Sequence, residues 1–77
     1  MTLLELQELA AEQDITEVRV DLFETVDNGR EAFVYVPLSP DVAFLRFPVS
    51  DYDRAWREVE RQLEPIGLVP CMGKGWR

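Results

Sequence analysis

The sequence predicts an α+β fold in a single small domain over residues 1–77, with the element order α-β-β-β-α and an apolar C-terminal tail. Three observations predict it. Apolar residues recur at helical spacing in two segments, three segments between them have strand patterns, and Asn28-Gly29 joins the first two strands. Because each element has one apolar side to bury, both helices are expected on one face of a three-stranded antiparallel meander. The body is expected over residues 1–64 and the tail over residues 65–77.

The first helix is predicted to run from Thr2 to Glu12, with Asp14 at its exit. Thr2 and Glu5 have the spacing of a capping box, which satisfies backbone N–H groups that the start of a helix leaves unpaired. The apolar stripe consists of Leu3, Leu6 and Ala10, broadened by Leu4 and Leu9. Glu5, Glu8 and Glu12 are expected to face solvent on the other side.

The three strands are predicted from alternation and turn signals. Residues 17–22 alternate apolar and charged side chains, which is typical of a half-buried strand. Asn28-Gly29 is a strong hairpin signal, since a type I′ turn needs positive φ at both central positions. The second strand is expected over residues 31–38 and the third over residues 42–49.

The second helix is predicted over residues 50–64, where Ser50 and Asp53 repeat the spacing of the first cap. Its apolar face consists of Tyr52, Ala55, Trp56, Val59 and Leu63. The charged residues Arg54, Arg57, Glu58, Glu60 and Arg61 lie mostly on the other face. Pro65 and Gly67 are expected to end the helix.

The hairpin register decides which residues the sheet leaves uncovered. A two-residue loop pairs Leu22 with Tyr35, and directly opposed residues share a face. The helix-covered face then holds Val18, Val20, Leu22, Phe33, Tyr35, Leu45 and Phe47, and the open face holds Phe23, Ala32, Val34, Val36, Val42 and Phe44. Phe23, Val34, Val36, Phe44 and the tail residue Trp76 form the candidate apolar partner-binding face. A one-residue bulge would instead turn Phe33 and Tyr35 outward.

The tail ends in the stretch PCMGKGWR and leaves two alternatives open. It folds back over the open sheet face, with a short fourth strand around Leu68 and Val69, because a small domain needs its apolar groups for stability. Alternatively, it stays mobile and becomes ordered on a partner, with Trp76 as the aromatic anchor.

The formal net charge of −7 arises entirely in the first third of the chain. Residues 1–29 hold eight acids and one base, whereas residues 30–77 hold seven of each. Such a field repels nucleic acid and membranes and attracts basic proteins. The candidate acidic partner-binding face consists of Glu5, Glu8, Glu12, Asp14, Glu17, Asp21, Glu24 and Asp27. The alternative is a solvated helix face beside an acidic edge strand that discourages aggregation.

No motif indicates catalysis, a metal or a cofactor. Cys71 is the only cysteine and the chain has no histidine, so the usual zinc clusters and a cysteine–histidine pair are excluded. Gly73-Lys74-Gly75 lacks the first glycine and the Ser or Thr of a phosphate-binding loop. We therefore expect neither catalytic nor metal-binding residues.

The element order and length over residues 2–64 resemble those of double-stranded-RNA-binding domains. That family opens its second helix with a lysine-rich cluster, whereas this chain has Asp51 and Asp53 there, so direct nucleic-acid binding is not expected. The acidic α-β-β-β-α layout also resembles some phage-encoded anti-CRISPR inhibitors, which occupy a basic groove by imitating phosphate charge. This resemblance implies a nucleic-acid mimic.

The sequence therefore predicts a non-catalytic acidic protein-binding module, an inhibitor or adaptor that engages a basic surface of a partner protein. The alternative is a small structural subunit or homodimer that associates through the open sheet face and the C-terminal tail. A cytoplasmic location is expected, because the single cysteine cannot form an internal disulfide and the first residues lack the basic segment of a secretory signal. No apolar stretch reaches the roughly 20 residues that span a bilayer, so no membrane contact is expected.

Overall fold

The computed structural model describes residues 2–27, 29–39, 41–50 and 52–76. Its elements are α1 (Leu3–Gln13), β1 (Glu17–Thr25), β2 (Gly29–Tyr35), β3 (Leu45–Pro48), α2 (Tyr52–Leu63), the 3₁₀ turn η1 (Glu64–Ile66) and β4 (Val69–Met72). The predicted α+β class and element order are confirmed. The second and third strands are both shorter than predicted. A fourth strand follows α2, as the tail alternative with a short strand proposed.

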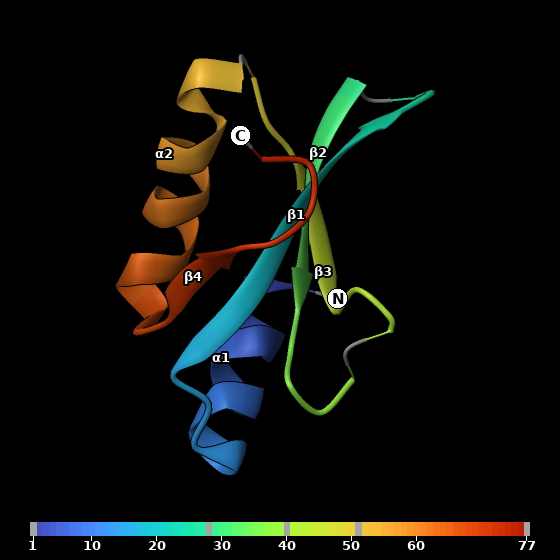
Figure 1. Cartoon of the computed structure of the whole chain (residues 1–77). Helices are drawn as coiled ribbons and strands as arrows, with labels where there is room; N and C mark the ends of the chain where they lie inside the picture. Colours follow the sequence, from blue (N-terminus) through green and yellow to red (C-terminus); the bar gives the residue numbers. More distant parts are fainter. Residues whose placement is uncertain (1, 28, 40, 51, 77) are drawn as a thin grey trace.

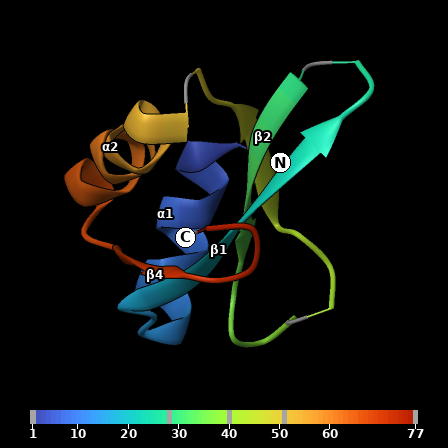
Figure 2. The ribbon, with the colours of Figure 1, turned by 45° about the horizontal axis from the view of Figure 1, so that its top comes forward.

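The four strands form one mixed sheet in the order β3-β2-β1-β4 (Figure 1). β1 pairs antiparallel with β2, β2 pairs antiparallel with β3, and β4 runs parallel to β1. Both helices lie on the same side of this sheet, as predicted (Figure 2). No helix of the described ranges lies on the other sheet face.

The hairpin between β1 and β2 has a different register from the predicted one. Val20 pairs with Val34, and Thr25 pairs with Gly29 as the last pair before the turn. Three residues therefore lie between the two strands, where the prediction had two. Gly29 has a φ of +70°, in the left-handed region that favours glycine. The other half of the predicted turn, Asn28, lies outside the described residues.

This register turns the second strand over, because a shift by an odd number of residues exchanges the two faces. The placement of Val34 and Val36 on the open face is therefore wrong, and these side chains are only 0% and 2% exposed. Ala32 is buried with them. Phe33 and Tyr35 are partly buried, and they lie on the face away from the helices, which matches the bulge alternative.

The core lies between the sheet and the two helices. It contains Leu6, Ala10, Val18, Val20, Leu22, Ala32, Val34, Val36, Leu45, Val49, Ala55, Val59, Leu63 and Leu68. Alternate residues of β1 enter it, so the period-two pattern of that strand is confirmed. At the start of α1, Thr2 Oγ1 accepts a hydrogen bond of 3.2 Å from the Glu5 N–H. At its end, Asp14 adopts a left-handed conformation with φ of 58°.

At the start of α2, Ser50 makes hydrogen bonds that the sequence did not predict. Ser50 donates through its backbone N–H and its hydroxyl to the two carboxylate oxygens of Glu58, at 2.8 and 2.9 Å. The predicted roles of Asp51 and the Asp53 side chain lie outside the described residues. None of the helices within the described part of the chain has the length and apolarity needed to cross a membrane.

The tail folds back along the free edge of β1 instead of covering the open sheet face, and this part of the expectation is wrong. The Gly73 N–H donates to the Val20 carbonyl at 2.7 Å, and the Leu22 N–H donates to the Lys74 carbonyl at 2.8 Å. Trp76 then reaches the helix side, where its ring meets that of Trp56 edge-to-face with centroids 5.0 Å apart. Figure 1 shows the end of the tail beside α2.

Candidate functional site

Three exposed carboxylates lie together on α1. Glu5, Glu8 and Glu12 are all exposed, and together with Leu9 and Phe44 they line a hollow of about 250 Å³. Their spacing of three and four residues places them on one side of the helix. The result is an apolar floor with a rim of negative charge, which we call the acidic hollow.

Two elements distant in sequence form the floor of this hollow. Leu9 belongs to α1 and is partly buried against the core. Phe44 lies in the loop before β3, where its backbone N–H donates to the Val34 carbonyl at 2.8 Å. This bond fixes the loop to β2, so that the Phe44 side chain also packs against the core and is held beside α1.

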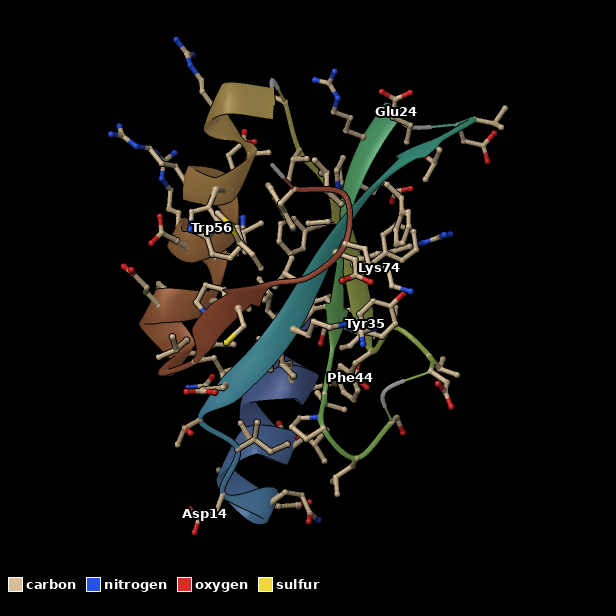
Figure 3. The ribbon with its side chains drawn as sticks, in the orientation of Figure 1. Asp14, Glu24, Tyr35, Phe44, Trp56 and Lys74 are labelled. Carbon is tan, nitrogen blue, oxygen red and sulfur yellow. The ribbon has the colours of Figure 1, made fainter. Side chains whose placement is uncertain are left out.

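In the described part of the chain, the negative charge of the acidic hollow has no counter-charge within ion-pair distance. Glu5 accepts a hydrogen bond from the Thr2 hydroxyl at 3.2 Å. Among the described residues, no cation lies within 4 Å of the carboxylates of Glu5, Glu8 or Glu12. The C-terminal end of a helix carries partial negative charge, which a basic residue in the last turn would offset. The last turn of α1 has no basic residue. The exposed Asp14 adds to the negative potential at that end (Figure 3).

The other predicted acidic residues do not join this surface. Asp21 is 2% exposed, accepts from the Lys74 backbone N–H at 2.8 Å and lies 3.3 Å from the Arg19 Nε. Its role in the structure is to hold the tail. Glu24 pairs with Arg30 at 3.7 Å, at the end of the molecule opposite Asp14 (Figure 3).

The remaining two acids are exposed but separate. Asp27 lies in the turn after β1. Glu17 begins β1, and its carboxylate lies 3.9 Å from the Cys71 Sγ. Together with Asp14 it lines a second hollow of about 340 Å³, whose apolar members are Ile15, Pro37 and Leu38. The eight predicted acids therefore form no single face: the three on α1 line the acidic hollow, and Asp14 and Glu17 line the second one.

The predicted apolar partner-binding residues are also dispersed. Val34 and Val36 are buried under the helices, Phe44 lies beside α1, and Trp76 packs on Trp56. Of these five predicted residues, only Phe23, at 39% exposure, lies on the outer sheet face.

The outer sheet face carries an aromatic cluster in which Phe23 is joined by Phe33 and Tyr35, two residues that the predicted register assigned to the core. Phe33 meets Phe23 edge-to-face with ring centroids 5.2 Å apart. The guanidinium group of Arg19 lies over the Tyr35 ring at 4.2 Å, and that of Arg46 lies over the Phe33 ring at 5.7 Å. These contacts cover part of the aromatic surface with charged groups. The only sequence signal for them was the bulge alternative of the hairpin.

Within the described ranges, no group of three or more His, Cys, Asp or Glu side chains is arranged to hold a metal ion. A scan against protein-family models found no match for the chain, and searches of curated proteins and of solved structures found no similar protein.

Proposed function

We propose that this protein is a non-catalytic, acidic protein-binding module that engages a basic segment of a partner protein through the acidic hollow. One observation carries the proposal: Glu5, Glu8 and Glu12 surround an apolar floor and have no cation within 4 Å among the described residues. Like charges at this spacing repel one another, and a basic partner would relieve that repulsion.

The geometry favours a partner segment of particular chemistry. Glu5 and Glu12 are seven residues apart, so the row of charge extends about 10 Å along the helix axis. Lysine or arginine side chains would pair with this row. An apolar side chain between them would enter the hollow and contact Leu9 and Phe44. A basic amphipathic helix or a basic loop with one leucine fits this description.

An inhibitor of a nucleic-acid-handling protein is the narrower form of this proposal. Basic grooves that hold phosphate backbones offer the charge that the acidic hollow lacks. The carboxylates of α1 would compete with phosphates for that groove. A cytoplasmic partner accords with the single free cysteine of the chain.

Affinity capture tests the proposal with the whole chain as bait. We expect the wild-type protein to retain a basic partner at about 0.15 M salt and to release it at about 1 M, where the screening length falls to about 3 Å. The variant E5Q/E8Q/E12Q should retain about tenfold less, since three exposed ion pairs of about 0.2–1 kcal/mol each are lost. Mass spectrometry of the eluates measures both effects.

A matched control has the same change in net charge elsewhere. The variant D27N/E60Q/E64Q also removes three negative charges but leaves the acidic hollow intact. It should retain the partner as well as the wild type does. Equal losses in both triple variants, or a partner that stays bound at 1 M salt, would contradict the proposal.

A second candidate function uses the outer sheet face in a homodimer or a small structural subunit. The supporting observation is the Phe23–Phe33 pair on the outer sheet face, where Phe23 is exposed. This pair takes the place of Val34 and Val36, which the sequence predicted on that face and which are buried. Aromatic and arginine side chains are enriched in interface cores. In the capture experiment, self-association that persists at high salt would favour this candidate over the acidic hollow.

A further inference from the structure

Three arginines of α2 form a cluster of positive charge on a chain whose net charge is negative. Arg54, Arg57 and Arg61 are spaced by three and four residues, so they lie on one side of the helix. All three are exposed, and together with Ser50 and Glu58 they line a hollow of about 370 Å³. We call it the arginine hollow.

No carboxylate forms an ion pair with these arginines among the described residues. Arg19, Arg30 and Arg46 each have a carboxylate within 4 Å, at distances of 3.3, 3.7 and 3.9 Å. No such pair involves Arg54, Arg57 or Arg61 in the described part of the chain. In a chain with a net charge of −7, this concentration of unpaired positive charge is unexpected.

The carboxylate that shares the arginine hollow is already occupied. Glu58 accepts hydrogen bonds from the Ser50 backbone N–H and hydroxyl, one on each oxygen, at 2.8 and 2.9 Å. It lowers the positive charge of the hollow without pairing with a guanidinium group within 4 Å. The lining therefore keeps an excess of positive charge over one carboxylate that is held in place.

We propose that the arginine hollow binds an anion with at least two linked phosphoryl groups. A guanidinium group is planar and pairs with phosphate oxygens through two parallel hydrogen bonds. Arg54 and Arg61 are separated by about 10 Å along the helix axis, so a chain of linked phosphoryl groups offers oxygens to all three arginines where a single phosphate offers fewer. The volume of about 370 Å³ falls in the range of small-molecule sites.

The bound anion also relieves a repulsion within the helix. Positive charges at three- and four-residue spacing destabilise a helix, and a phosphoryl chain laid along them removes that effect. The ligand is either a free inorganic polyphosphate or the phosphate chain of a nucleotide. Both share the chemistry that the arginines recognise. The site is on α2 and is independent of the proposed function of α1.

Calorimetric titration of the full-length protein with sodium triphosphate tests this proposal, with ionic strength held constant by sodium chloride. We expect one triphosphate per chain and at least tenfold weaker affinity for R57Q. R54Q, a second variant of an exposed arginine in the hollow, should also bind triphosphate at least tenfold more weakly. R46Q makes the same chemical change on the outer sheet face and should change the affinity less than twofold. Orthophosphate should bind at least tenfold more weakly than triphosphate.

Adenosine triphosphate distinguishes the two sources of the phosphoryl chain. Affinity equal to that of triphosphate supports a free polyphosphate, whereas tighter binding supports a nucleotide whose base adds contacts. Either result supports the site. The proposal is overturned if millimolar triphosphate gives no heat of binding, if R57Q and R46Q lose affinity equally, or if orthophosphate binds as well as triphosphate.

Discussion

Replacing Gly75 with alanine should release the C-terminal tail and lower the free energy of unfolding by about 3 kcal/mol. Gly75 has a φ of +87°, and an added Cβ would overlap the backbone carbonyl oxygen of Leu22. A backbone atom in a strand cannot move aside as a flexible side chain does. The tail must therefore leave the edge of β1, and the Trp56–Trp76 contact is lost with it. Urea denaturation followed by tryptophan fluorescence measures the change.

Gly67 supplies the matched control, since it has nearly the same φ without the overlap. Its φ is +81°, and nothing lies within 4 Å of an added Cβ. G67A should therefore show only the left-handed backbone strain, about 1–2 kcal/mol. In the folded state, only G75A should lose the near-ultraviolet circular dichroism of the paired tryptophans. Equal destabilisation by the two substitutions would show that the tail does not depend on close approach at Gly75.

Replacing Leu6 with alanine should lower the free energy of unfolding by about 3 kcal/mol. Leu6 is 0% exposed, and Leu6 and Ala10 are the buried residues of α1. The loss is large for a chain of 77 residues, whose total stability is expected to be about 4–12 kcal/mol. Because these two residues hold α1 on the sheet, amide hydrogen exchange in α1 should accelerate first.

Leu4 tests whether this effect comes from burial. It lies on the same helix and is 64% exposed, so L4A should change the stability by less than about 0.5 kcal/mol. Chemical denaturation of the two variants side by side gives the comparison. Similar losses for L4A and L6A would contradict the described packing of α1.

The helices and the strand order β1-β2-β3 could be predicted because their signals are local. Thr2 caps α1 through the predicted bond from the Glu5 N–H, although the Glu5 carboxylate accepts from the Thr2 hydroxyl rather than from a backbone N–H, and Asp14 ends α1 as expected. The charged and apolar residues of β1 alternate clearly, so its buried face was also predicted. These features depend on neighbours a few residues apart, which the sequence shows directly.

The hairpin register could not be predicted, because both faces of β2 are apolar. Ala32, Val34 and Val36 alternate with Phe33 and Tyr35, and either set could form the core. The structure buries the smaller side chains under the helices. The larger rings on the other face are partly covered by Arg19 and Arg46, which belong to other strands. A pattern within one strand does not contain that information.

The candidate site was predicted only in part for the same reason. The carboxylates of α1 follow from helical spacing, but the floor of the acidic hollow needs Phe44, more than thirty residues further along the chain. Asp21 looked equally exposed in sequence, yet the Lys74 backbone reaches it across 53 positions. Long-range contacts of this kind decide which acids remain free for a partner.

Amide chemical-shift mapping in solution tests the central claim most directly. The ¹⁵N-labelled protein is titrated with a synthetic peptide that carries arginines at helical spacing around one leucine. We predict shifts at residues 5–14 and at Phe44, no shifts in E5Q/E8Q/E12Q, and weaker binding as salt rises above about 0.15 M. Shifts confined to the outer sheet face around Phe23 and Tyr35, or no shifts at all, would contradict the account.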